Sequence, residues 1–298
     1  MEPTSPTAVA DYEAHTGEGP VYHADEKRVY SLDIPDGELY RYNPENGTSE
    51  LVYRRDGPEE YIGGFTVQAD GTLLLFEEGG RIELYDDGAT KAVVETIEGE
   101  EGKRFNDVIA DPRGRVFCGT MPADGEGVGS LYRLDTDGSL TQLRDDVGLP
   151  NGMGFTPDRE SMYFTDTVAG EILRYDYDED TGGLSNPETV VSGGAPGHPD
   201  GMTVDATGHL WSARWGGGCL ARFTPDGEPA GRVEFDAKKV SCLTFAGPDY
   251  TDVYVTTALG PGEGPANTRK EEGPDAGKLF RLDLGVRGLP EFRSRVGR

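Results

Sequence analysis

The stretch Gly197-His198-Pro199-Asp200-Gly201-Met202-Thr203-Val204 places one carboxylate at the start of a short apolar run and follows it at once with glycine. Related phrases occur at five other points of the chain. Three of them carry a short oxygen-bearing side chain before the apolar run: Gly17-Glu18-Gly19-Pro20-Val21, Phe105-Asn106-Asp107-Val108-Ile109 and Pro150-Asn151-Gly152-Met153-Gly154-Phe155. Two are weaker copies: Gly63-Gly64-Phe65-Thr66-Val67 and Ser241-Cys242-Leu243-Thr244-Phe245. Six related phrases indicate a chain built from repeats.

A second repeated phrase measures the length of the repeat. Its six copies align on Leu39, Ile82, Leu131, Ile172, Leu220 and Leu279, at steps of 43, 49, 41, 48 and 59 residues. Propeller blades run about 40–50 residues, so the steps are typical of them. Another apolar phrase precedes each copy, turns rich in Gly, Asp and Pro separate the phrases, and no window has a convincing helical period. The sequence therefore predicts an all-β fold, a six-bladed β-propeller of four-stranded antiparallel blades.

The two ends of the repeat array differ from its middle. No clear outer strand follows Leu282 in the sixth copy, whereas a spare apolar run covers residues 8–12 near the N-terminus. We expect the N-terminal run to fill the vacant place and close the ring, because closure removes exposed strand edges. The step of 59 residues is explained by an inserted loop at 259–277, rich in Gly, Pro and Glu, which we interpret as a disordered or lid-like surface loop. We expect residues 1–298 to form a single propeller domain.

Propeller geometry gives the first repeated phrase a location. The first strand of each blade lines the central channel, so the residues that begin these strands face the axis at one end of the channel. The six residues in this position are Glu18, Gly63, Asn106, Asn151, Asp200 and Ser241. Two carboxylates and two amides aimed at one point would repel one another unless a cation lay among them. Oxygen ligands suit a hard ion such as calcium, magnesium or manganese.

The charge of the chain limits its partners. Acidic residues number 55 against 28 basic ones, which gives a formal net charge of −27 and makes binding to nucleic acid or to an anionic membrane unfavourable. The basic residues comprise 21 Arg and only 7 Lys, and the acidic residues are spread along the whole chain. A dispersed acidic surface suits high salt, where self-repulsion is screened. We therefore predict a halophilic protein.

Other features of composition point to the cell interior. The cysteines Cys118, Cys219 and Cys242 are isolated in apolar runs, which predicts buried thiols and no disulfide framework. The N-terminus has no cationic region followed by an apolar core, and no apolar run is long enough to span a membrane. We expect a soluble cytoplasmic protein, as a monomer or weak homo-oligomer.

Several motifs connect the chain to a known family. They are Glu18-Gly19-Pro20, Arg104-Phe105-Asn106-Asp107, Gly119-Thr120-Met121, Asn151-Gly152-Met153, and Pro199-Asp200-Gly201-Met202 with His209-Leu210-Trp211. From Gly17 to about Leu289, the chain resembles the senescence-marker-protein/gluconolactonase/luciferin-regenerating family, which includes regucalcin and bacterial sugar lactonases. The resemblance implies a six-bladed propeller with one catalytic divalent cation (calcium, magnesium, manganese, zinc or iron). It also implies metal-dependent hydrolysis of a sugar-derived, aldonic acid lactone to the free acid.

The resemblance assigns roles to individual residues. It implies that Glu18, Asn151 and Asp200 are the metal ligands, and that Arg104 and Asn106 bind the ring oxygens and hydroxyl groups of the substrate. A further residue, Asp124, stands roughly where some relatives place an acidic sugar-binding residue, although the sequence from Gly125 to Gly129 departs from the family pattern.

Lactone hydrolysis requires a polarised carbonyl, an activated water and stabilisation of the oxyanion, and a cation with open coordination positions serves the first and last of these. Asp200 is the candidate catalytic residue, because a carboxylate beside the water can relay its proton. Each residue also has a simpler interpretation: Asp200-Gly201 as a turn, Arg104 as a surface charge beside Lys103, and His198 as a structural residue. No Gly-x-Ser-x-Gly nucleophile motif occurs. The alternatives for the whole protein are a non-catalytic metal-binding propeller scaffold and a phosphotriesterase-like metallo-hydrolase.

Overall fold

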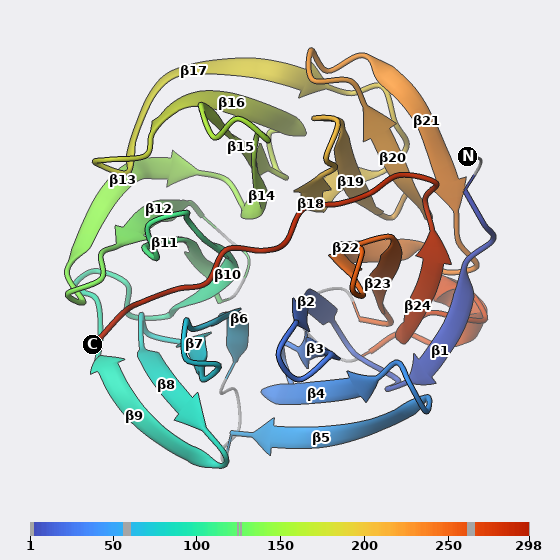
Figure 1. The fold of residues 1–298 in the computed structure, drawn as a ribbon, viewed down its shortest axis with the longest axis horizontal. Coiled ribbons are helices and arrows are strands. Elements are labelled where there is room, and N and C mark those ends of the chain that lie inside the picture. Colours follow the sequence, from blue (N-terminus) through green and yellow to red (C-terminus); the bar gives the residue numbers. More distant parts are fainter. Residues whose placement is uncertain (1–2, 56–60, 124, 126, 261–265, 298) are drawn as a thin grey trace.

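The computed structural model describes residues 3–55, 61–123, 125, 127–260 and 266–297 of the chain. In this part of the chain the strands form six four-stranded antiparallel sheets arranged as blades around one axis (Figure 1). The predicted six-bladed propeller is confirmed.

Each blade is named here by its order along the chain. Blade 1 consists of β2 (Gly17–His23), β3 (Arg28–Asp33), β4 (Glu38–Asn43) and β5 (Thr48–Arg54). Blade 2 consists of β6 (Ile62–Val67), β7 (Leu73–Glu77), β8 (Ile82–Asp86) and β9 (Ala89–Val94). Blade 3 consists of β10 (Lys103–Ala110), β11 (Val116–Pro122), β12 (Gly129–Leu134) and β13 (Leu140–Val147). Blade 4 consists of β14 (Pro150–Phe155), β15 (Ser161–Asp166), β16 (Glu171–Asp178) and β17 (Gly183–Ser192). Blade 5 consists of β18 (His198–Val204), β19 (Leu210–Trp215), β20 (Cys219–Phe223) and β21 (Pro229–Glu234). Blade 6 consists of β22 (Lys239–Ala246), β23 (Asp252–Ala258), β24 (Lys278–Asp283) and β1 (Thr7–Asp11).

The ring is closed by the two ends of the strand array. Strand β1 pairs antiparallel with β24, with Thr7 opposite Arg281 and Asp11 opposite Lys278. The N-terminal strand is therefore the outer strand of blade 6, as predicted, and it covers the edge that β24 would otherwise expose.

The hydrophobic core lies between the blades. Six main clusters of buried side chains each join two neighbouring blades, as in the contact between blades 3 and 4, where Phe117 and Leu131 pack with Met153 and Phe164. Both faces of every sheet are thus apolar near the axis, which is why the inner strands read as continuous apolar runs. The three cysteines are buried free thiols, as predicted.

The inserted loop after β23, which we interpreted as disordered or lid-like, packs against the propeller in its described part. Its described part contains the helix α1 (Arg269–Glu272), and the buried Glu272 side chain forms a 3.0 Å ion pair with Lys239. Ala276 and Leu259 are buried against Ala237, which lies in the connection between β21 and β22. These contacts fix the described part of the loop to the propeller, so it is not disordered; residues 261–265 lie outside the described part. Since α1, the one helix in the described residues, spans four residues, no described helix is long enough to cross a membrane.

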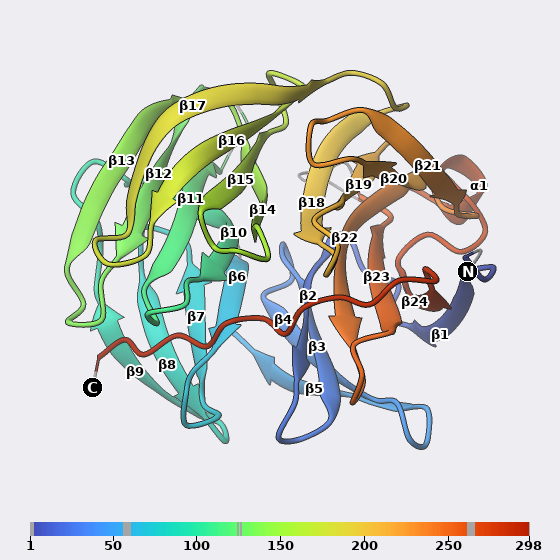
Figure 2. The same cartoon turned by 45° about the horizontal axis from the view of Figure 1, so that its top comes forward.

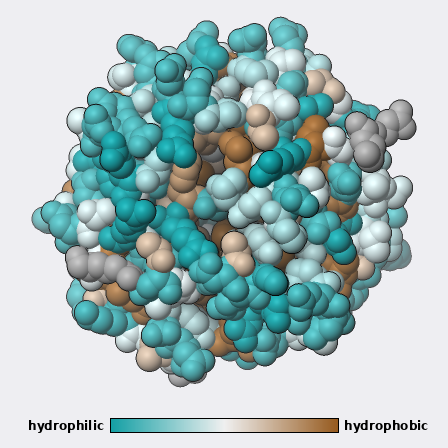
Figure 3. Space-filling model, in the orientation of Figure 1, coloured by the Kyte–Doolittle hydropathy of each residue, from teal (hydrophilic) through white to brown (hydrophobic). Residues whose placement is uncertain are grey.

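After β24 the chain crosses one end of the propeller (Figures 1 and 2). Gly288 forms an isolated bridge with Asp205, which follows β18, and Ser294 forms one with Gln68, which follows β6. The C-terminal segment therefore lies where the innermost strands end, opposite to the end where they begin. Figure 3 shows this face as mostly hydrophilic, with apolar side chains gathered in the hollow near its centre.

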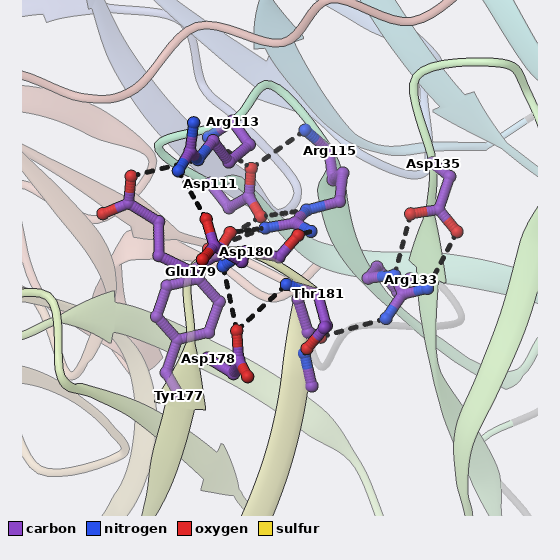
Figure 4. A network of polar contacts seen from close by, with 12 residues as sticks. Asp111, Arg113, Arg115, Arg133, Asp135, Tyr177, Asp178, Glu179, Asp180 and Thr181 are labelled. Carbon is purple, nitrogen blue, oxygen red and sulfur yellow. Dashed lines mark hydrogen bonds and ion pairs between the residues drawn. The ribbon is translucent and has the colours of Figure 1, made fainter.

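A polar network joins blades 3 and 4 at the same end (Figure 4). Asp111, which follows β10, is fully buried, and its carboxylate accepts hydrogen bonds from the Arg115 backbone N–H (3.0 Å) and the Tyr177 hydroxyl (2.8 Å). The Arg115 guanidinium donates to the same carboxylate at 2.5 Å and to the Glu179 carbonyl at 2.6 Å. Among the described residues, no buried polar side-chain atom of this network lacks a hydrogen-bond partner, so the network serves to connect the two blades.

Candidate metal and active site

The six innermost strands share an irregularity at the residues that the sequence places in a ring. Their ladders shift register between Glu18 and Val21, Ile62 and Gly64, Phe105 and Val108, Asn151 and Met153, Pro199 and Met202, and Val240 and Cys242. A β-bulge re-aims the side chain that it carries. The six predicted positions are thus equivalent in the structure, and all lie where the innermost strands begin.

Close contact between neighbouring blades explains the glycines in this motif. A Cβ atom on Gly152 would lie 2.4 Å from the Met202 nitrogen, and one on Gly201 would lie 2.6 Å from the Cys242 Cβ. Real side chains do not approach so closely, so only glycine lets the next blade pack here. Asp200-Gly201 lies inside β18, which excludes its interpretation as a simple turn.

Buried carboxylates gather at this end of the channel. Glu18 and Asp200 are each 5% exposed. Burial raises the pKa of Glu18 well above its usual range, and the carboxylates of Asp200 and Asp107 raise it further. Burial and the Asp107 carboxylate raise the pKa of Asp200 in the same way. The site therefore holds more negative charge than its protein surroundings can stabilise.

The amide of Asn151 leaves an oxygen free beside these carboxylates. Its Nδ2 donates to the Thr167 hydroxyl at 3.1 Å, and that hydroxyl donates to the Pro199 carbonyl at 2.7 Å. The Asn151 Oδ1 is buried and has no hydrogen-bond partner among the residues that the structure describes. A buried acceptor without a donor, next to two carboxylates, fits a hard divalent cation.

Two further predicted residues meet in blade 3. Arg104 Nη1 donates to Asn106 Oδ1 at 2.9 Å, and Asn106 Nδ2 donates to the Pro150 carbonyl at 2.8 Å. Arg104 is 4% exposed, so it is not a surface charge, and its guanidinium lies 5.7 Å from the centre of the Tyr61 ring. It also lowers the pKa of Glu18, which places it beside the proposed metal ligands. Asp124 lies outside the described residues, and the side chain of His198 is exposed.

Two residues near the site were not predicted from the sequence to have a role in it. Burial raises the pKa of Asp107 to about 7, against the opposing effect of Arg104. Asp107 occupies the place that Gly152 and Gly201 take in the equivalent phrases, and this difference was a signal within the sequence. The second is Arg214 in β19, which is buried and belongs to no motif that recurs among the repeats. Its positive charge lowers the pKa of Asp200.

A separate acidic cluster lies at the end of β3, in the connection that follows it and at the start of β4. Asp33, Asp36 and Glu38 have carboxylate oxygens within 4.8 Å of one another. The Asp33 oxygens accept hydrogen bonds from the backbone N–H groups of His15 (2.8 Å) and Thr16 (2.9 Å), and Glu38 forms an ion pair with Arg54. Protein donors therefore account for Asp33 and Glu38, and Asp36 is exposed, in contrast to the buried Asn151 Oδ1.

Comparison with known proteins shows the family of the chain. The family described as the SMP-30/Gluconolactonase/LRE-like region matches residues 16–259. The chain belongs to this family. One family member, pentonolactonase XacC from Haloferax volcanii, is 51% identical over 292 residues, which cover 97% of this chain and 98% of the relative. The putative sugar lactone lactonase YvrE from Bacillus subtilis is 34% identical, with 94% of each chain covered.

The family fold is also seen in solved structures. The crystal structure of regucalcin from Agrobacterium tumefaciens, described as a calcium-binding protein, superposes with a TM-score of 0.89 at 28% identity and covers 99% of both chains. The net charge of −27, from which we predicted a halophilic protein, is consistent with family membership shared with the Haloferax relative.

Proposed function

We propose that the protein is a metal-dependent lactonase that opens the lactone of an aldonic acid to the free acid. The observation that carries the proposal is the pair of buried carboxylates, Glu18 and Asp200, beside the free Asn151 oxygen. This arrangement occurs in a chain 51% identical to a pentonolactonase, so a pentonolactone is the first substrate to test.

Glu18, Asn151 and Asp200 would hold one divalent cation at the start of the innermost strands. When bound, the cation supplies Lewis-acid chemistry, which polarises the lactone carbonyl and offsets the charge of the oxyanion. The metal could be calcium, magnesium, manganese, zinc or iron, and the calcium-binding description of the regucalcin structure makes calcium a natural first choice.

Residues of the chain supply the remaining functions. One Asp200 carboxylate oxygen accepts the proton of the attacking water and passes it to the ring oxygen as the lactone opens. Arg104 and Asn106 orient the substrate through its ring oxygen and hydroxyl groups, and their mutual hydrogen bond of 2.9 Å fixes both side chains before the substrate arrives. Asp124 stays a predicted sugar-binding residue, and the cytoplasmic location and the monomeric or weakly oligomeric state stay predictions.

A substrate panel tests this proposal. The protein is stripped of metal in high salt, reconstituted with each of the five cations, and assayed on γ- and δ-lactones of pentonic and hexonic acids and on a phosphotriester. We expect turnover of aldonic lactones that depends on the added cation. Turnover of the phosphotriester alone would favour the phosphotriesterase-like alternative, and tight metal binding without any turnover would favour the scaffold.

A further inference from the structure

Arg214 is a buried cation at the proposed metal site. It is 2% exposed and is among the largest fully buried side chains in the described part of the chain. It lies in β19, directly opposite Pro199 of β18, so its neighbour across the ladder is the residue before Asp200. Such a group is costly to bury, and its presence requires a physical reason.

The partners of this guanidinium are unusual for a buried arginine. Two other arginines of the propeller lie on carboxylates, Arg115 on Asp111 at 2.5 Å and Arg222 on Asp205 at 3.0 Å. Among the described residues no carboxylate lies within ion-pair distance of Arg214. Its Nε donates instead to the Pro196 carbonyl at 3.0 Å and its Nη2 to the Gly197 carbonyl at 3.1 Å. The planar guanidinium thus bridges two successive backbone carbonyl groups.

The loop that receives these bonds leads directly into Asp200. Gly197 has a φ of +67°, and a Cβ atom on it would lie 2.4 Å from the Gly217 nitrogen. A Cβ atom on Gly217 would lie 2.4 Å from the Pro196 carbonyl oxygen. The loop is therefore pressed against the turn that follows β19, and the two hydrogen bonds of Arg214 hold it in that position.

We propose that Arg214 is a positioning residue that fixes the Pro196–Gly197 backbone and, through it, the Asp200 carboxylate. This inference rests on the proposed function, in which Asp200 binds the cation and accepts the proton. Neighbours that hold a metal ligand in place are worth roughly 10–100-fold in metal affinity or activity. The fork of two N–H donors, and not the positive charge alone, is the feature that the loop requires.

The sign of the effect on metal binding separates positioning from charge. A guanidinium near the site repels a bound cation, so if charge were its main influence, removing it would strengthen metal binding. If Arg214 positions Asp200, removing it weakens metal binding. Arg214→Lys keeps the charge but cannot place two donors in the same plane, whereas Arg214→Met removes the charge and keeps much of the apolar volume.

The experiment measures Mn²⁺ binding by calorimetry, together with kcat and KM on an aldonic lactone at saturating metal. We expect Arg214→Lys and Arg214→Met both to bind Mn²⁺ about 10–100-fold more weakly and to lose kcat by a similar factor. KM should change little, because the substrate-binding pair Arg104 and Asn106 belongs to blade 3. The control is Arg222→Lys in β20 of the same blade, which should lower the melting temperature and leave Mn²⁺ affinity and kcat unchanged.

Three results would overturn the inference: tighter or unaltered Mn²⁺ binding by Arg214→Met, full activity of Arg214→Lys, or equal losses in the Arg222→Lys control. If Arg214→Met does not fold, as circular dichroism would show, Arg214→Lys alone decides. A wild-type protein that binds Mn²⁺ but hydrolyses no lactone would sink the proposed function, and the Mn²⁺ affinities would still decide whether Arg214 positions Asp200.

Discussion

The Asn106 side chain donates a 2.8 Å hydrogen bond to the carbonyl oxygen of Pro150. Asn106 belongs to blade 3, and Pro150 stands directly before Asn151 in blade 4. The proposed substrate-binding amide and the proposed metal-binding amide are therefore connected through a single contact across the blade interface. A change at one of them is expected to be felt at the other, but weakly, because the contact reaches the backbone of Pro150 and not the Asn151 side chain.

Asn106→Ala is expected to lower kcat/KM on a lactone by about 5–150-fold, since one hydrogen bond to a buried polar group is worth about 1–3 kcal/mol. Metal affinity should fall by no more than a few fold, measured by calorimetry on the same preparation. Arg104→Ala should behave alike, because Arg104 orients the same amide. Loss of metal binding in Asn106→Ala would mean that the amide is itself a metal ligand and that its assigned role is wrong.

Replacement of Asp200 should have the largest effect on turnover. Asp200→Asn keeps the size and one ligand oxygen but removes the group that accepts the proton, and general acid–base catalysis contributes roughly 10²–10⁴-fold. Glu18→Gln also removes a negative charge but leaves the proton acceptor in place. At saturating metal, Asp200→Asn should therefore lose more kcat than Glu18→Gln.

Melting temperature and metal content of both variants control for folding. A folded Asp200→Asn variant with near-normal turnover would exclude the mechanism, even though the fold would stand.

Asp107 should make the stability of the metal-free protein depend on pH. Its pKa is raised to about 7, so the folded state binds this proton more tightly than the unfolded chain, whose aspartate has a pKa near 3.9. Between these two values, stability falls as the pH rises. Asp107→Asn removes this contribution, so the variant should not lose this stability as the pH rises. Its free energy of unfolding should therefore increase relative to that of the wild type from about pH 4 to pH 7. Urea titrations of both metal-free proteins across this range test it; parallel curves would show that Asp107 has an ordinary pKa.

Low salt should unfold the protein more readily than moderate heat. The net charge of −27 repels itself over a distance that grows from ~3 Å at 1 M salt to ~10 Å at 0.1 M. The free energy of unfolding, measured by urea titration, should rise steeply between 0.1 M and multimolar KCl. Potassium chloride and sodium chloride should act alike if screening is the cause. A free energy that is flat over this range would contradict the halophilic interpretation.

The repeats predicted the propeller and the location of Glu18, Asn106, Asn151 and Asp200, because each of these follows from a phrase that recurs with its register intact. The closure was predicted from the missing outer strand of the sixth copy and the spare run at residues 8–12. Arg214 could not be found in this way. It is a single residue in β19, and only the fold brings its side chain beneath the Pro196–Gly197 backbone. The position of the C-terminal segment could not be predicted for a related reason. This segment is held by isolated contacts, such as that of Ser294 with Gln68, and such contacts leave no strand pattern in the sequence. The packing of the described part of the inserted loop depends on Ala276 and Glu272, whose burial is likewise decided by distant residues.

The pairing of Thr7 with Arg281 also sets an order of events during synthesis. Strand β1 precedes the other described strands and belongs to the last blade to be completed, so it has no partner until β24 has been translated. Blades 1 to 5 are each continuous in sequence and can pair as they emerge, whereas β1 remains a tethered, unpaired strand throughout. Contacts between such distant residues are slow to form, because a long loop must close first. A nascent chain arrested before residue 278 lacks β24 and therefore offers no strand with which β1 can pair.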